Sequence, residues 1–189
     1  MNRTALANED KPQASMVKED YTAEFIFVNE IFADDDFNCR GHITAIDVID
    51  LARDIQKAGL QTPIVVQPWD KLKGYKYRCV AGYRRLMAFR VNKEKQIPAF
   101  IRHGLSDLEA RKINLKENLI RKELNILQEA KAISPYIFAS WTEQDIAQEF
   151  EQSRGWVQIR KAVLMLPPAI QKEVAAGILT QDNIRRCSL

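Results

Sequence analysis

The sequence predicts an α+β protein in which a small domain built on a mixed sheet is followed by an all-α region containing a helix-turn-helix. Every segment with strand character lies within residues 25–101. After residue 106 all segments with a clear period are helical. Of the 189 residues, 46% are apolar, enough to bury one sizeable core or two small ones. Strands interspersed with helices and then a run of helices are typical of α+β architecture.

The first 22 residues are polar and without period, so we expect a flexible tail there. The fold should begin at the apolar run 25–28. Between residues 44 and 59, apolar residues recur at i, i+3, i+4 and i+7, which predicts one amphipathic helix stopped by Gly59.

Two strands are expected next, at 63–66 and at 75–80, joined through a turn at 73–74. A helix should start near Gly82. The segment 97–101 predicts a third strand, in which Pro98 is tolerable near the start or on a sheet edge.

Capping pairs predict where helices begin in the second half. The pairs are Ser106 with Glu109, Asn125 with Gln128, and Thr142 with Asp145. A further helix should begin at 167–168. The expected division is a flexible tail at 1–22, a mixed domain at 23–122, and a helical domain at 123–189 with its helix-turn-helix at about 142–164.

Positive charge is concentrated in the middle of the chain. The net charge is +3, but residues 1–70 hold 6 basic and 13 acidic side chains (−7), residues 71–122 hold 15 and 4 (+11), and the remainder holds 7 and 8 (−1). Such a segment suits a polyanion, although a solvated basic face explains the charge equally well.

Other classes are disfavoured. The three cysteines are too few and too scattered for a disulfide framework or a structural metal. With no secretory signal and no apolar run of about 18 residues, we expect a cytoplasmic protein that does not enter a membrane.

A first candidate site is the segment 80–88, where a predicted strand leads through Gly82 into a helix. Free backbone N–H groups at a helix start bind anions, and glycine lets a phosphate approach the backbone. Arg84 and Arg85 in the first turn oppose the helix dipole unless an anion lies beside them. The alternative is that one arginine pairs with a carboxylate of the acidic N-terminal third.

A second candidate is the segment 116–125. Glu117 and Asn118 at a helix end offer oxygen atoms to a magnesium ion or to a phosphate-bound water. Arg121 stands at i+4 from Glu117, so an ordinary surface salt bridge is the alternative.

Together these segments, a Gly-x-Arg-Arg box followed by a Glu-Asn-x-x-Arg box, resemble the ParB/Spo0J partition-protein family from about Val28 onward. The resemblance implies a sulfiredoxin-like N-terminal fold and a CTP-binding, CTP-hydrolysing switch with Mg2+. It implies that Glu117 and Asn118 serve phosphate and magnesium, and that the backbone near 61–66 reads the base. The implied nucleotide-binding residues are Arg40, Thr62, Ile64, Gly82, Tyr83, Arg84, Arg85, Glu117, Asn118 and Arg121.

Two departures bear on turnover. Tyr83 stands where the family usually has the glutamate associated with hydrolysis, and Asn38 with Cys39 replaces a Gln-Pro pair before Arg40. A tyrosine with a reference pKa of about 10 is a poor general base at neutral pH. Nucleotide binding is therefore better supported than hydrolysis, which should be a weak CTPase activity at most, with Glu117 as the candidate catalytic residue.

Residues 142–150 and the helix after Ser153 fit a helix-turn-helix, with Ile146, Phe150 and Val157 as its core. We expect Arg154 and Gln158 to read base edges of double-stranded DNA. The full set of candidate DNA contacts is Thr142, Ser153, Arg154, Gly155, Gln158, Arg160 and Lys161, the last two as phosphate contacts. A plain helical hairpin is the alternative, since Glu151 occupies the usual turn glycine position and Arg160 a usually apolar one.

The resemblance implies a homodimer, associated with the nucleoid, that acts in plasmid, phage or chromosome partition or in related transcriptional regulation, with a ParA-like ATPase as a possible partner. The chain ends without the dimerisation domain of long family members, so it is naturally short or a fragment. Two alternatives stay open: an enzyme of the superfamily, such as a nuclease or small-molecule kinase, or a DNA-binding adaptor that has lost nucleotide binding.

Overall fold

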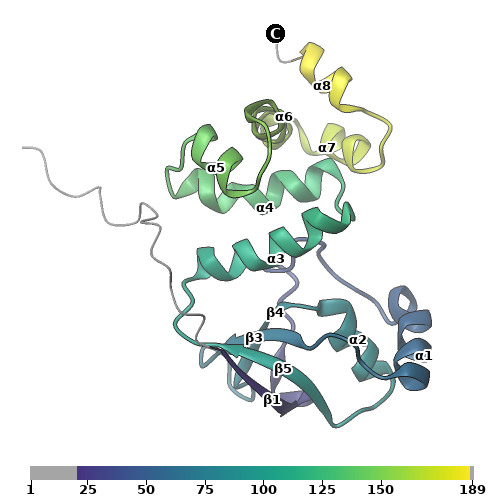
Figure 1. Cartoon of the computed structure of the whole chain (residues 1–189). Coiled ribbons are helices and arrows are strands. Elements are labelled where there is room, and N and C mark those ends of the chain that lie inside the picture. Colours follow the sequence, from purple (N-terminus) through teal and green to yellow (C-terminus); the bar gives the residue numbers. More distant parts are fainter. Residues whose placement is uncertain (1–20, 188–189) are drawn as a thin grey trace, which may run out of the picture.

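A five-stranded mixed sheet forms the first half of the protein, in a computed structural model that describes residues 21–187 (Figure 1). Its strands are β1 (Tyr21–Phe27), β2 (Ile31–Phe32), β3 (Ile64–Pro68), β4 (Tyr77–Ala81) and β5 (Gln96–Arg102). They lie in the order β1-β5-β3-β4-β2. The β1–β5 and β3–β4 pairs are antiparallel, whereas β3–β5 and β2–β4 are parallel. The predicted α+β fold is confirmed.

Helices occupy the rest of the described chain. Two short 3-10 turns are η1 (Val28–Glu30) and η2 (Ile46–Val48), and the α-helices are α1 (Ile49–Ala58), α2 (Tyr83–Val91), α3 (Asp107–Arg121), α4 (Ile126–Phe138), α5 (Glu143–Glu149), α6 (Arg154–Met165), α7 (Pro168–Ala175) and α8 (Gln181–Cys187). Within residues 21–187, none of these helices has both the length and the apolar character needed to cross a bilayer.

Most elements begin where their local sequence predicts. Ser106, Asn125 and Thr142 each form a complete capping box, and Ser153 caps α6 by accepting a hydrogen bond from the Trp156 N–H. The helix expected after residue 44 is a 3-10 turn that continues into α1, and it ends at Gly59 as predicted. Strand β2 was not predicted, because two residues are too few to show a period. Strand β1 was not predicted as a strand either, and it begins at Tyr21, inside the tail expected at 1–22; the rest of that tail, residues 1–20, lies outside the described residues.

Pro98 lies near the start of an internal strand rather than on a sheet edge. It pairs with Phe25 of β1 and directly precedes Ala99, the first residue of β5 that pairs with β3. Since proline has no N–H, a position before this parallel pairing begins loses no ladder bond to β3.

A proline inside α4 is accommodated by its neighbour. Pro135 lacks the N–H that would bond to the carbonyl of Lys131. The Ser134 hydroxyl donates to that carbonyl instead, at 2.8 Å. The helix therefore continues to Phe138 without leaving this acceptor unsatisfied.

Helix α3 is shared between the sheet and the helical half, and Figure 1 shows it between them. Ala110 belongs to the core formed with the sheet, whereas Leu115 belongs to the core formed with α4, α5 and α6. The expected boundary at residue 122 falls just after this helix. Any residue that α3 presents to a ligand is thus also connected to the helical half.

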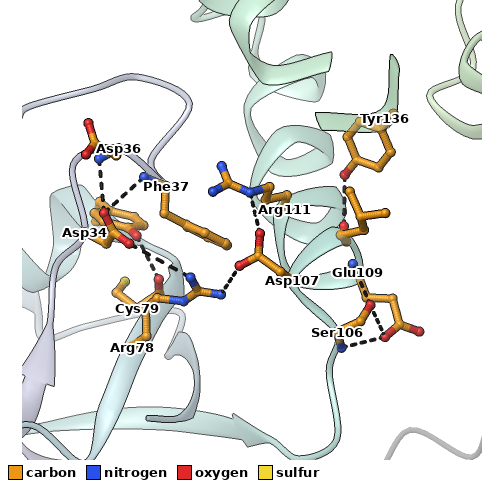
Figure 2. Close-up of polar contacts among 12 residues, drawn as sticks. Asp34, Asp36, Phe37, Arg78, Cys79, Ser106, Asp107, Glu109, Arg111 and Tyr136 are labelled. Atoms are coloured by element: carbon orange, nitrogen blue, oxygen red, sulfur yellow. Dashed lines mark hydrogen bonds and ion pairs between the residues drawn. The ribbon is translucent and has the colours of Figure 1, made fainter. Parts of the chain in front are cut away.

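A buried arginine fixes the start of α3 on the sheet (Figure 2). Arg78 on β4, 3% exposed, places its guanidinium 2.8 Å from Asp107 on α3 and 3.9 Å from Asp34 in the loop after β2. Its Cζ also lies 4.0 Å from the centre of the Phe37 ring. These contacts join three segments that are distant in sequence.

Candidate functional site

A cavity of about 340 Å3 lies where α1, the start of α2, α3 and the loop at residues 38–43 meet. Helix α3 lines it with four polar residues at helical spacing. These are Asn114, Glu117, Asn118 and Arg121. Other lining residues come from α1 and the segment after it, and they include the apolar side chains of Leu51, Ile55, Ala58 and Leu60.

Gly82 places the start of α2 at this cavity. It is the N-cap residue, has φ of +94°, and provides no side-chain cap for the first N–H groups of the helix. A Cβ atom at this position would lie 2.8 Å from Cγ2 of Ile64 and 3.0 Å from Cζ of Arg85. Only glycine fits both the backbone angle and the space, and the uncapped N–H groups remain suited to an anion.

Arg85 and Glu117 connect the two predicted boxes directly. The Arg85 guanidinium donates to the carbonyls of Thr62 and Pro63 at 2.7 and 2.6 Å, and to Oε1 of Glu117 at 2.8 Å. Arg121 lies 3.5 Å from the same carboxylate oxygen. The Arg85 side chain is only 13% exposed. It therefore joins α2 and α3 to the residues just before β3, and its carboxylate partner comes from the second box rather than from the acidic N-terminal third.

Arg40 and Arg84 approach the cavity from two other segments. Arg40 donates from Nε to Oδ1 of Asn118, and Arg84 donates to the carbonyl of Asp47 at 3.2 Å. Burial, followed by the charge of Arg84, lowers the pKa of Arg40. Both guanidinium groups pair with Glu123 at the α3–α4 junction, Arg84 at 4.0 Å. This part of the cavity therefore carries converging positive charge.

Asn114 is a site residue that the sequence reasoning missed. It is 2% exposed, accepts from the Cys39 N–H at 3.0 Å and donates to the Val80 carbonyl at 2.8 Å. It thus holds the loop that carries Arg40 against β4. Its spacing of three and four residues from Glu117 and Asn118 was the signal that could have revealed it.

Nine of the ten predicted nucleotide-binding residues line this one cavity. They are Arg40, Thr62, Gly82, Tyr83, Arg84, Arg85, Glu117, Asn118 and Arg121. Ile64 is not in the wall, because its side chain is fully buried beneath Gly82. The Tyr83 hydroxyl points inward and donates to the Cys79 carbonyl at 2.8 Å, and burial raises its pKa. Tyr83 is therefore positioned to offer a backbone N–H rather than its hydroxyl.

One oxygen of Glu117 and the amide oxygen of Asn118, the proposed magnesium ligands, are already engaged by guanidinium groups. Oε1 of Glu117 is shared by two guanidinium groups, and Oδ1 of Asn118 accepts from Arg40. Magnesium requires several oxygen ligands in near-octahedral geometry. Across residues 21–187, no three His, Cys, Asp or Glu side chains cluster as a metal site. Magnesium binding by these two residues stays a prediction.

The helix, turn and helix expected in the second half are present as α5 and α6. Ile146, Phe150 and Val157 are buried in one core, as predicted, and Ala147 is buried with them. Glu151, at the usual glycine position of the turn, adopts φ of +54°. The turn geometry is therefore kept without a glycine, at some cost in backbone energy.

The candidate DNA-contacting side chains of α6 gather around a single carboxylate. Glu143 accepts from Gln158 at 3.1 Å and from Lys161 at 2.7 Å, and Arg154 lies 3.9 Å away. These hydrogen bonds, from Lys161 first, lower the pKa of Glu143. Thr142 and Ser153 are exposed but use their hydroxyls as helix caps, and Gly155 lies half-buried beside them.

Arg160 does not belong to this surface, which corrects its prediction as a phosphate contact. It is 3% exposed, and its Nε donates to Glu129 on α4 at 2.9 Å. Its guanidinium also donates to Gln181 at 3.2 Å and stacks 4.5 Å from the Trp156 ring centre. As the usual apolar character of this position suggests, it faces the interior between helices.

Comparison with known proteins places the chain in a family. The model of the ParB N-terminal domain family matches residues 13–119. The chromosome-partitioning protein ParB of Caulobacter vibrioides is 34% identical over 140 residues, which are 74% of this chain and 45% of that protein. The chain thus spans about half the length of the curated relatives it matches.

A solved structure extends the similarity into the helical half. The C-terminally truncated chromosome-partitioning protein ParB from Caulobacter crescentus, complexed to the centromeric parS site, is 29% identical. The alignment covers 86% of this chain and 82% of that one, with a TM-score of 0.62. A structure of the truncated protein complexed with CTP-gamma-S is 30% identical over 87% of this chain and 91% of that one, with a TM-score of 0.48.

Proposed function

The chain belongs to the ParB N-terminal domain family, and on that premise we propose that it is a DNA-binding protein switched by a nucleoside triphosphate, CTP in particular. Its role would be in partition of plasmid, phage or chromosomal DNA or in related transcriptional regulation. The observation that carries the proposal is the convergence of both boxes and Arg40 on one cavity.

Two kinds of lining group suit the two halves of a nucleotide. Arg40, Arg84 and the N-terminus of α2 offer phosphate groups guanidinium and backbone N–H donors. The apolar wall from α1 offers a surface to a base and sugar. The choice of CTP rests on the resemblance of the two boxes to the family rather than on this geometry.

Turnover should be slow. Tyr83 has its hydroxyl buried against Cys79, so it cannot replace a glutamate facing the cavity. Glu117, the remaining candidate, has Oε1 engaged by Arg85 and Arg121. The cavity is therefore better suited to holding a triphosphate than to cleaving it.

DNA binding is supported by the helical half. The Caulobacter crescentus structure that aligns over most of this chain is a complex with parS DNA. Here Arg154 and Gln158 are exposed near the start of α6, the part of a recognition helix that enters the major groove. A homodimer and a ParA-like ATPase partner remain part of the proposal through the family relationship.

Titration calorimetry with CTP and with ATP, each with magnesium, tests the nucleotide. We expect CTP to bind selectively and Arg84→Ala to weaken it by about tenfold or more, since charge-assisted hydrogen bonds contribute about 1.5–3 kcal/mol. Arg53→Ala is the matched control, because Arg53 pairs with Asp50 on α1 and does not line the cavity. Equal losses in the two variants would refute the phosphate role of Arg84.

An adaptor that binds DNA without nucleotide is the second candidate. One observation favours the adaptor: the arginine donors of the cavity are satisfied without a ligand. Arg85 pairs with Glu117, and Arg40 pairs with Asn118 and Glu123. Fluorescence anisotropy with a parS-containing duplex, with and without CTP, separates the two. DNA affinity that responds to CTP in wild type but not in Arg84→Ala supports the switch, and affinity indifferent to CTP in both supports the adaptor.

A further inference from the structure

Glu123 occupies a distinctive place in the cavity region. It follows Lys122, the C-cap residue of α3, whose φ of +54° ends that helix. From this junction between α3 and α4 its carboxylate pairs with both Arg40 and Arg84, the two arginines that come from outside α3 and are not held by Glu117. Its side chain is 31% exposed, so a ligand in solution can compete for the same donors.

We propose that Glu123 is an internal substitute for a phosphate group, which holds the α3–α4 junction against the cavity until a triphosphate displaces it. A guanidinium group satisfies a carboxylate and a phosphate with the same N–H donors. A triphosphate carries several negative charges against one for Glu123 and also reaches the N-terminus of α2. It therefore binds the two guanidinium groups in place of Glu123 and releases that carboxylate.

Release of Glu123 would loosen the attachment of the helical half to the cavity. Gln128 of the α4 capping box accepts from the Asn125 N–H through Oε1, and through Nε2 it donates to the Arg40 carbonyl at 2.9 Å. Arg40 thus binds Glu123 through its side chain and Gln128 of α4 through its backbone carbonyl. If the Arg40–Glu123 ion pair is lost, the Gln128 hydrogen bond is the one remaining contact of these kinds between Arg40 and residues 122–128 in the described part of the chain.

This inference rests on the proposed nucleotide site, and it deepens it by naming an autoinhibitory residue. Glu123→Gln keeps the side-chain size and removes the charge. Glu149→Gln is the matched control, because Glu149 also pairs with two cations, Lys112 and Lys116, and neither of these lines the cavity, whereas Arg40 and Arg84 do. Calorimetry on the full chain would use CTP with magnesium, and inorganic tripolyphosphate as a probe of the anion site alone.

We expect Glu123→Gln to bind both ligands about fivefold more tightly than wild type, the size of one partly exposed ion pair. Glu149→Gln should stay within about twofold of wild type. Binding that is unchanged or weaker in Glu123→Gln, while the wild type binds CTP, would overturn the inference and leave the proposed function standing. Tripolyphosphate binding without CTP binding would instead refute the nucleotide, and the comparison of variants would still decide the role of Glu123.

Hydrogen exchange on the ligand-free proteins provides a second measurement that needs no ligand. Amides of residues 122–128 should exchange faster in Glu123→Gln than in wild type, and not faster in Glu149→Gln. Exchange that is equal in wild type and Glu123→Gln would show that Glu123 does not hold the junction, whatever the cavity binds.

Discussion

Gly82→Ala should be among the most damaging single changes in the sheet domain. Its φ of +94° lies beyond the range that other residues use readily, a cost of about 1–2 kcal/mol. The new Cβ would also lie 2.8 Å from Ile64 and 3.0 Å from Arg85. Ile64 is fully buried and Arg85 is held by two carbonyls and a carboxylate, so neither can move freely. Overpacking of this kind costs about 1–3 kcal/mol, for a total near 2–5 kcal/mol.

Urea denaturation followed by far-ultraviolet circular dichroism measures this loss. Gly74→Ala is the matched control, since Gly74 has φ of +95° and no heavy atom within 4 Å of the new Cβ. The control should lose only the backbone cost. Ile64→Ala is itself destabilising, because Ile64 is fully buried, but the losses of Ile64→Ala and Gly82→Ala should be less than additive in the double variant, because removing the Cγ2 atom relieves the close contact. Equal losses at Gly82 and Gly74 would show that backbone angle alone, and not close approach to Ile64 and Arg85, requires the glycine.

Three further outcomes are expected. Glu129→Ala should lower the free energy of unfolding by about 3 kcal/mol, because it leaves the buried charge of Arg160 unpaired. Urea denaturation measures this loss. The double variant with Arg160→Met should regain stability relative to Glu129→Ala, which is the internal check. Arg154→Ala should weaken DNA binding, whereas Arg160→Met should leave the salt dependence of binding unchanged, as anisotropy at several salt concentrations would show. Burial raises the pKa of Cys39 from 9.0 to about 12. The thiol's contribution to the free energy of unfolding is therefore full below pH 9 and is lost as the pH rises from 9 toward 12. Cys39→Ala should lose stability less steeply over this window, and an identical pH profile in the two proteins would contradict the burial argument.

Local signals account for what could be predicted of the fold. The caps at Ser106, Asn125 and Thr142 involve residues three apart, and Gly59 ends α1 through its own backbone angle. The resemblance to the family, carried by the two boxes, is confirmed. Strand β2 escaped prediction because its two residues acquire strand character only by pairing with β4.

Charge pairing, by contrast, could not be predicted from spacing. Arg160 stands at a usually apolar helix position, but its ion-pair partner there, Glu129, lies 31 positions earlier on another helix. Glu143 on α5 accepts hydrogen bonds from Gln158 and Lys161 on α6. Which cation meets which carboxylate depends on how helices pack, and packing joins residues that no local period relates.

The sequence by itself determined the strands and helices long enough to show a period, the glycine at the start of α2 and the two boxes, because hydrogen bonds within a few residues and the periods of helix and strand specify them. Only the tertiary structure decided that both boxes share one cavity, and that Arg40 and Arg84, which line it, meet the carboxylate of Glu123. Electrostatic partners are chosen by distance in space, and only the packed sheet and helices set those distances.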